Sequence, residues 1–173
     1  MEKLKIIITK DRIRKRVDEL IYEIGRDFEY DDLVVIGILT GSFIFLSDLV
    51  RGFYKHKIRP VIDFMTVSAY GSGVKSKGEV DIIQDIKVPI KQRPVLVVDD
   101  ILDTGLTLKK IVEILKSRKP LMIKTCVLLK KRRKDLLIEV DYYGFEIPDV
   151  YVIGYGLDFN GRYRELPYIA KIL

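Results

Sequence analysis

Apolar residues recur along the chain in two alternating patterns, one helical and one typical of buried strands. From Asp11 to Phe28 they return every three or four residues, which predicts an amphipathic helix. Two more helices are expected, one from Ser42 to about Tyr54 and one from near Thr107 onward. Continuous apolar runs predict strands at residues 33–39, 61–67, 94–98, 123–129 and 150–153. This alternation indicates an α/β fold, a doubly wound parallel sheet with helices on both faces.

Two stretches lie outside this alternation. Residues 70–79 are rich in glycine, serine and lysine and have no apolar period, which predicts a long exposed loop with a functional role. Residues 142–173 mix glycine, proline and aromatic residues, which indicates a small hood over the edge of the sheet. The sequence shows no internal repeat and no interdomain linker. We therefore expect one domain over residues 1–173, to which residues 142–173 contribute the hood.

The composition indicates the size of the core, the cellular compartment and the charge of the binding partners. A chain of 173 residues is long enough to bury one real core. Its one cysteine, Cys126, has no partner for an internal disulfide, and no apolar stretch approaches the roughly 18 residues of a membrane span, so we expect a cytoplasmic protein. The net charge of +6 suits either a polyanionic small substrate or nucleic acid.

Candidate chemistry is concentrated after the predicted strand at residues 94–98. Two adjacent carboxylates, Asp99 and Asp100, are followed by a turn with Gly105 and by the start of a helix. Ligands of open α/β sheets bind at the carboxyl ends of strands, and a helix N-terminus after a glycine turn binds anions. The carboxylates repel each other unless Mg²⁺ or sugar hydroxyls lie beside them. An ordinary helix cap explains a single aspartate here but not the whole combination.

This segment closely resembles the phosphoribosyl pyrophosphate motif of type I phosphoribosyltransferases. The resemblance implies that Asp99 and Asp100 hold the ribose hydroxyls and the Mg²⁺ environment. It also implies that the next turn wraps the 5-phosphate, through Asp103, Thr104, Gly105, Leu106 and Thr107. In the purine-specific branch of the family, the residue that matches Asp103 is the general base at purine N7.

Two further segments resemble parts of the same family. The turn at residues 39–42 is similar to the pyrophosphate loop, which would bind through the backbone at Thr40 and Gly41. In relatives a non-proline cis peptide often precedes the residue that matches Thr40, and many relatives have lysine there instead of threonine. Residues 67–71 are similar to the entrance of the flexible loop that closes over the reacting centre, which assigns a substrate contact to Tyr70.

The C-terminal part resembles the purine-binding hood of hypoxanthine–guanine members of the family, and the resemblance extends from about Ile7 to Leu173. It implies that Tyr151 stacks on the base, that the backbone of Val152 reads its N1 and C2 edge, and that Asp158 binds a second metal ion. Arg164 would contact pyrophosphate. In the basic run at residues 130–134, a gap-free count back from residue 144 assigns the contact with purine O6 to Lys130 rather than to Lys131.

These features lead us to expect a purine salvage enzyme with Mg²⁺ as cofactor. It would move 5-phosphoribosyl from phosphoribosyl pyrophosphate to N9 of hypoxanthine or guanine, as a homodimer or homotetramer. Two alternatives stay open. One is an enzyme of the same fold that prefers xanthine. The other is a nucleic-acid-binding regulator of this fold, which the +6 charge and the basic run favour but which would need neither the base Asp103 nor a closing loop.

Overall fold

The centre of the computed structural model is a six-stranded sheet with the strand order β4-β3-β2-β5-β6-β7. The model describes residues 3–28, 32–69 and 80–173. The parallel strands are β2 (Val34–Leu39), β3 (Val61–Ala69), β5 (Pro94–Leu102), β6 (Met122–Lys131) and β7 (Tyr142–Ile147). Strand β4 (Val80–Gln84) runs antiparallel at the edge beside β3.

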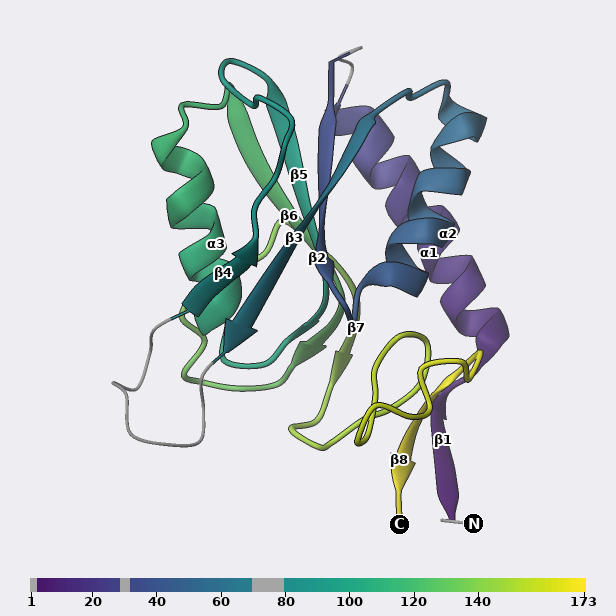
Figure 1. Ribbon diagram of the computed structural model, residues 1–173. Coiled ribbons are helices and arrows are strands. Elements are labelled where there is room, and N and C mark those ends of the chain that lie inside the picture. The colour runs from purple at the N-terminus through teal and green to yellow at the C-terminus, as the bar shows by residue number, and fades with distance from the viewer. Residues whose placement is uncertain (1–2, 29–31, 70–79) are drawn as a thin grey trace.

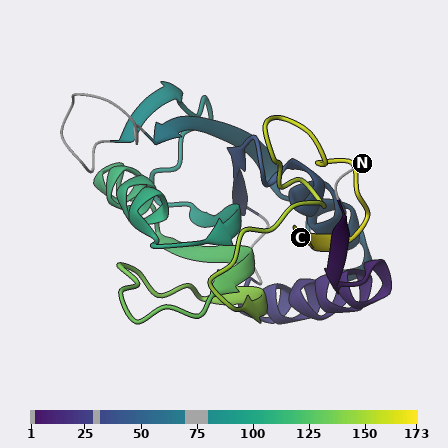
Figure 2. The ribbon, with the colours of Figure 1, turned by 90° about the horizontal axis from the view of Figure 1, so that it is seen from below.

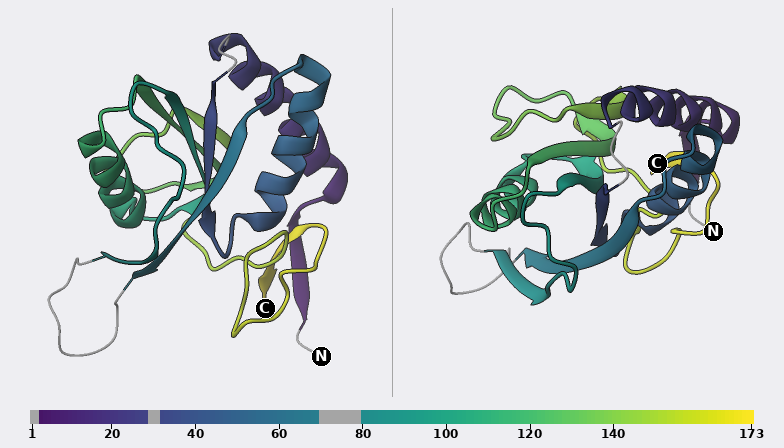
Figure 3. Two further views of the ribbon diagram at one scale, coloured as in Figure 1. Left: turned by 45° about the horizontal axis from the view of Figure 1, so that its top comes forward. Right: turned by 90° about the horizontal axis from the view of Figure 1, so that it is seen from above.

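Helices cover both faces of this sheet, which confirms the predicted doubly wound α/β fold. Helices α1 (Lys10–Asp27) and α2 (Phe43–Phe53) lie on one face, and α3 (Leu106–Ser117) lies on the other (Figures 1 and 3). A short 3-10 turn, η1 (Tyr54–His56), follows α2. Each helix turns its apolar stripe to the sheet, so the core consists of one buried cluster on each face. No helix in the described parts of the chain is long and apolar enough to cross a membrane.

The hood joins the two ends of the chain. Strand β1 (Leu4–Ile8) pairs antiparallel with β8 (Ile169–Ile172), so the two termini lie side by side (Figures 1 and 2). The segment between β7 and β8 crosses the carboxyl ends of the strands and is joined to β8 by the bridge between Ile153 and Ala170. Tyr155 attaches the hood to α2, because its hydroxyl donates to Asp48 Oδ2 at 2.6 Å.

The structure corrects several predicted strands. Residues 150–153 do not form a strand, and the last parallel strand is instead β7, in which the buried residues 142, 144 and 147 are separated by exposed or half-buried ones. Such a strand contains no continuous apolar run, and the sequence pattern also does not indicate the short strands β1, β4 and β8. Strand β5 continues four residues further than the predicted range, because pairing with β6 extends to Leu102. The acid pair therefore lies within the strand and not beyond its end.

Candidate active site

Two hollows meet at the carboxyl ends of the parallel strands. The first, of about 260 Å³, lies between the end of β2 and the turn that connects β5 to α3. The second, of about 210 Å³, lies between the same turn and residues 150–158 of the hood. Asp100, Ile101 and Asp103 line both hollows. Two reactants bound in the neighbouring hollows would therefore meet at these residues.

The wall of the first hollow is the turn that begins α3. Gly105 has a φ of +83°, which favours glycine, and a Cβ there would lie 2.8 Å from Ile138 Cγ2. Gly105 is itself the residue before the helix, so the N-cap position has no side chain that could cap the helix. The Thr104 hydroxyl accepts a hydrogen bond from the Leu106 amide at 3.3 Å. Together with Thr107, which also lines the hollow, this turn has the amides and hydroxyls of a phosphate site.

The opposite wall is the turn after β2. The peptide bond between Leu39 and Thr40 is cis, as in the pyrophosphate loops that this segment resembles. Gly41 lies so close to Asp100 that a Cβ there would be 1.6 Å from Asp100 Oδ2. Only glycine lets the carboxylate lie against this backbone. The Thr40 side chain is exposed and brings no charge to the turn, so any anion held here would depend on backbone amides.

The acid pair of β5 is electrostatically unbalanced. Asp99 and Asp100 are half-buried, and Asp99 Oδ1 accepts from the Asp100 amide at 2.9 Å. Burial raises the pKa of Asp99 well above its usual range, and the charge of Asp100 adds to the rise. Burial also raises the pKa of Asp100, although the charge of Arg164 offsets part of this effect. Within the described chain, neither carboxylate forms a direct ion pair, so the pair lacks a close positive charge.

A hard divalent cation fits this pair. In the described part of the chain, no group of three or more His, Cys, Asp or Glu side chains could hold a metal ion by itself. Mg²⁺ usually binds to one or two carboxylates together with water and substrate phosphates. The pair therefore suits an ion that binds together with a phosphorylated substrate. Asp158 is already engaged, because its Oδ1 pairs with Arg164 Nη2 at 2.8 Å and its Oδ2 accepts from the Gly161 amide at 2.7 Å.

The second hollow has the features of a site for a flat ring. Tyr151 and Val152 line it, and the Tyr151 side chain is 61% exposed. The Tyr151 hydroxyl donates to the Asp158 carbonyl at 2.6 Å, and its ring meets Phe159 edge to face at 5.9 Å. The ring is thus held at its edge while it remains accessible. An exposed aromatic ring that is fixed in this way can stack on another ring without a large loss of side-chain entropy.

Contacts of Arg164 and Gly156 join the hood to the first hollow. Arg164 Nη1 donates to the Gly156 carbonyl at 2.6 Å, and Gly156 has a φ of +104°. A Cβ on Gly156 would lie 2.2 Å from the Gly41 carbonyl oxygen. The hood therefore rests directly on the turn after β2. Arg164 stands at this junction, where its charge acts on Asp100.

Lys131, and not the predicted Lys130, lines the second hollow in the structure. Neighbouring residues of a strand point to opposite faces. Lys130 pairs with Glu139 at 3.2 Å and lies 5.2 Å from the centre of the Tyr143 ring. Lys131 lines the hollow, and its Nζ lies 3.1 Å from Asp103 Oδ2. Burial lowers the pKa of Lys131, but contacts with Asp149 and Asp103 outweigh it and raise the pKa overall.

The basic run at residues 130–134 begins with the last two residues of β6, and carboxylates neutralise most of its charge. Besides the pairs of Lys130 and Lys131, Arg132 Nε pairs with Glu146 at 2.9 Å, and Arg133 pairs with Asp135 at 2.9 Å. Four consecutive cations thus have acidic partners within the protein. A surface that binds nucleic acid needs cations that are free to replace counterions along a phosphate backbone. This run does not offer such a surface.

The two hollows bring together most of the predicted site residues. The first contains Gly41, Asp99, Asp100, Asp103, Thr104, Gly105, Leu106 and Thr107; the second contains Asp100, Asp103, Tyr151, Val152 and Asp158. Thr40 is exposed beside the first hollow, and Arg164 reaches the second through Asp158. Tyr70 and the predicted loop at residues 70–79 lie outside the described residues. Sequence reasoning missed the contacts of Arg133 and Asp149 with Asp103 and Lys131.

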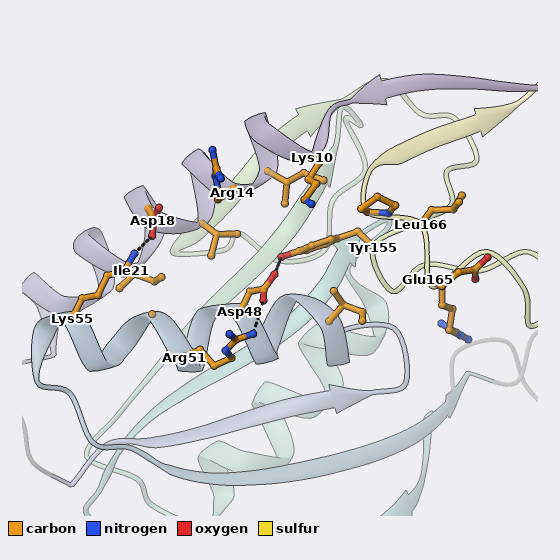
Figure 4. Close-up of a pocket in the computed structure, with 16 residues that line it drawn as sticks. Lys10, Arg14, Asp18, Ile21, Asp48, Arg51, Lys55, Tyr155, Glu165 and Leu166 are labelled. Atoms are coloured by element: carbon orange, nitrogen blue, oxygen red, sulfur yellow. Dashed lines mark hydrogen bonds and ion pairs between the residues drawn. The ribbon is translucent and has the colours of Figure 1, made fainter.

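A larger cavity, of about 590 Å³, lies between α1, α2 and the hood, and of the predicted site residues only Arg164 lines it (Figure 4). Its floor is apolar, and its rim holds charged side chains from both helices. Many of these are paired, as in the ion pair of Lys55 with Asp18 at 2.8 Å and the bond of Tyr155 to Asp48. The acid pair, the phosphate-type turn and the exposed aromatic ring all lie at the smaller hollows. The larger cavity lacks these features, so we propose the smaller hollows as the site of chemistry.

Comparisons with known proteins agree over almost the whole chain. A sequence model described as a phosphoribosyl transferase domain matches residues 5–160. The hypoxanthine-guanine phosphoribosyltransferase of Aquifex aeolicus is 45% identical over 173 residues, which cover 99% of this chain and 96% of that protein. That of Dictyostelium discoideum is 43% identical and covers 97% and 94%. The crystal structure of a hypoxanthine phosphoribosyltransferase from Staphylococcus aureus superposes with a TM-score of 0.90 at 42% identity, over 98% and 91% of the two chains.

Proposed function

The chain belongs to the phosphoribosyl transferase family and is a transferase of purine salvage, and we propose that it acts on 6-oxopurines. It moves 5-phosphoribosyl from phosphoribosyl pyrophosphate to N9 of hypoxanthine or guanine, which gives IMP or GMP and pyrophosphate. The observation that carries this proposal is the junction of the two hollows at Asp100 and Asp103. One hollow suits a phosphorylated sugar and the other suits a base, and a glycosidic bond forms where two such ligands meet.

The first hollow binds phosphoribosyl pyrophosphate. The turn at residues 103–107 holds the 5-phosphate through amides and hydroxyls at the start of α3. Asp99 and Asp100 accept from the ribose hydroxyls. The backbone at Thr40 and Gly41, together with Arg164, holds the pyrophosphate group. Amides that are fixed before the reaction stabilise the charge of the leaving group without reorganisation.

Mg²⁺ would be held at Asp99 and Asp100, with Asp158 as a candidate ligand for a second ion. When bound, it supplies positive charge that neutralises the leaving pyrophosphate. Within the described chain, the acid pair is compensated by backbone hydrogen bonds and, at a distance, by the charge of Arg164. We also place the protein in the cytoplasm, because its one cysteine, Cys126, is free, and we propose that it forms a homodimer or homotetramer.

The second hollow binds the purine. Tyr151 stacks on the ring, and the backbone of Val152 faces the N1 and C2 edge. The ammonium of Lys131 donates to O6, in place of Lys130. Asp103 lies 3.1 Å from that ammonium and accepts the proton from N7 while N9 attacks the anomeric carbon. The oxygen on C6 and the proton on N7 point to the same edge of the purine, and the ammonium of Lys131 and the carboxylate of Asp103 likewise lie side by side in the protein.

The proposal is tested by turnover with a panel of bases. The protein is incubated with phosphoribosyl pyrophosphate, Mg²⁺ and each of hypoxanthine, guanine, xanthine, adenine and uracil, and the nucleotide is assayed. We expect turnover of hypoxanthine or guanine and little with adenine, whose amino group at C6 cannot accept from Lys131. Xanthine differs only at C2 and tests the alternative preference. Turnover of none of the purines would contradict the proposal.

Lys131→Ala should impair the use of 6-oxopurines more than Lys130→Ala does. A hydrogen bond from a charged donor is worth about 1.5–3 kcal/mol, so kcat/KM for hypoxanthine should fall roughly 10–100-fold in Lys131→Ala. KM for phosphoribosyl pyrophosphate should change little, because Lys131 lines the base hollow and does not line the first hollow. Steady-state kinetics of both variants decide the assignment. A larger loss of kcat/KM in Lys130→Ala than in Lys131→Ala would assign the O6 contact to Lys130.

A further inference from the structure

Four charged side chains from different segments form a closed ring at the back of the base hollow. Asp103 follows β5, Lys131 ends β6, Arg133 lies in the next loop, and Asp149 follows β7. Lys131 Nζ lies 3.1 Å from Asp103 Oδ2 and 3.1 Å from Asp149 Oδ1. Arg133 Nη1 lies 3.1 Å from Asp103 Oδ1 and 2.8 Å from Asp149 Oδ2. Each cation therefore contacts both carboxylates, and the signs of charge alternate around the ring.

We propose that Arg133 and Asp149 are positioning residues, which hold Asp103 and Lys131 as one acceptor–donor pair facing the N7 and O6 edge of the purine. The inference rests on the proposed function, because it assigns no new reaction. Asp103 and Lys131 line the base hollow, whereas Arg133 and Asp149 do not. The two outer residues can therefore act on the purine only through the two inner ones.

The ammonium of Lys131 has a donor left for substrate. An ammonium group has three N–H donors, and the ring occupies two of them, toward Asp103 and Asp149. The Lys131 side chain is only 12% exposed, and the open side of its ammonium is the base hollow. A lysine stem is flexible, so its partners set the position of its charge. Without Asp149, the ammonium would move toward Asp103 alone and away from the place where it meets O6.

Arg133 fixes the carboxylate of Asp103 from outside the hollow. Its Nε and Nη2 pair with both oxygens of Asp135, at 3.0 and 2.9 Å, so the plane of the guanidinium is set by a two-point contact. Its Nη1 is then directed at Asp103 and Asp149. Each oxygen of Asp103 thus has one cationic neighbour and retains a further lone pair. Asp103 can accept a proton from N7 without breaking either contact.

The ring couples selection of the base to its activation. A 6-oxopurine with a proton on N7 presents an acceptor, O6, and a donor, N7–H, on the same edge of the ring, which match Lys131 and Asp103. Adenine presents an amino donor in place of O6, which opposes the ammonium donor. A site built to hydrogen-bond one group discriminates strongly against a ligand that leaves this group unpaired. The two outer residues therefore contribute to the preference for 6-oxopurines although they touch no substrate.

The first test compares Asp149→Asn with Glu146→Gln. Both changes remove one carboxylate charge from the same stretch of chain, but Glu146 pairs with Arg132 outside the ring. We expect Asp149→Asn to lower kcat/KM for hypoxanthine roughly tenfold and to leave KM for phosphoribosyl pyrophosphate within about twofold. The ratio of hypoxanthine turnover to adenine turnover should also fall in Asp149→Asn. Glu146→Gln should behave as the wild type.

The second test compares Arg133→Gln with Arg132→Gln. We expect Arg133→Gln to lower kcat for hypoxanthine roughly tenfold, because Asp103 is no longer held, and Arg132→Gln to leave it unchanged. Arg133→Lys should restore part of the loss, because it returns the charge without the planar contact to Asp135. Circular dichroism melts check that each variant is folded. If either Asp149→Asn or Arg133→Gln does not fold, the kinetics of the other variant decide whether the inference holds.

The outcomes separate this inference from the proposed function. If the wild type turns over no purine, the proposed function fails, and the inference fails with it. If the wild type is active and both ring variants match their controls, the inference is overturned while the proposed function stands. An equal loss of affinity for phosphoribosyl pyrophosphate and hypoxanthine in the ring variants would also overturn it, because that result indicates general damage to the fold.

Discussion

Asp103→Asn is expected to lower turnover by roughly 10²–10⁴-fold, which is the usual size of a lost general acid–base contribution. Asparagine has nearly the same shape as aspartate but cannot accept a proton at neutral pH. Asp103 lines both hollows, so the change acts at the point where sugar and base meet. The loss should appear in kcat, with KM for phosphoribosyl pyrophosphate little changed, because the missing interaction is made in the transition state.

The structure removes a competing explanation for such a loss. Asp103 could have been important only as a cap of the following helix, but the residue before α3 is Gly105, so the N-cap position has no side chain that could cap the helix. The cost to the fold should therefore come only from weaker contacts with Lys131 and Arg133.

Asp85→Asn provides a matched control for Asp103→Asn, because Asp85 also pairs with an arginine, Arg118, but lines neither hollow and has no contact with the ring. Steady-state kinetics and thermal melts of both variants are the measurement. Near-normal turnover of Asp103→Asn would show that the base is another group. A variant that does not fold would be replaced by Asp103→Ser.

Removal of divalent metal is expected to abolish turnover. Without a metal ion, phosphoribosyl pyrophosphate brings its phosphates close to Asp99 and Asp100, whose raised pKa values already reflect an unfavourable environment for negative charge. The turn at Thr40 has no side-chain cation, although many relatives have lysine at this position. Among the described residues that line the hollows, Lys131 is the one cation, and it already pairs with Asp103 and Asp149, so the ion carries most of the compensation at the acid pair.

The measurement is turnover after exhaustive chelation, followed by titration with Mg²⁺ or Mn²⁺. We expect activity to vanish and then to return with either ion. A thermal shift caused by phosphoribosyl pyrophosphate should disappear and return in parallel, since the same ion assists substrate binding. Full turnover in the chelated protein would contradict the assignment of Asp99 and Asp100 to a metal site.

The large periodic elements of this fold could be predicted because their signals are local. The apolar stripe of residues 11–28 became α1 within a residue at each end, since spacings of three and four have no other simple interpretation. Strand β7 could not be found in this way. Its buried residues are separated by exposed or half-buried ones, and Gly144 occupies a buried position where a larger side chain would meet Leu128.

The site was predictable as far as its parts are contiguous in sequence. The turn after β5 forms one motif, and it appears in the structure as one wall of a hollow. The choice between Lys130 and Lys131 could not be made from the sequence because it depends on register, and a shift of one residue along a strand moves a side chain to the other face. The ring of Asp103, Lys131, Arg133 and Asp149 could not be predicted, because three segments that are separate in sequence meet only in the folded protein.

The joining of β1 to β8 also has a consequence for the order in which the site assembles. These strands lie at opposite ends of the chain, whereas β2 and β5, which carry the phosphate-binding turns, are much closer along it and pair directly. Contacts between distant segments close larger loops at a higher entropic cost, and they slow folding. We therefore expect the sheet and its phosphate turns to form before the hood closes. During folding the protein would pass through a state that can hold phosphates but cannot yet select a base.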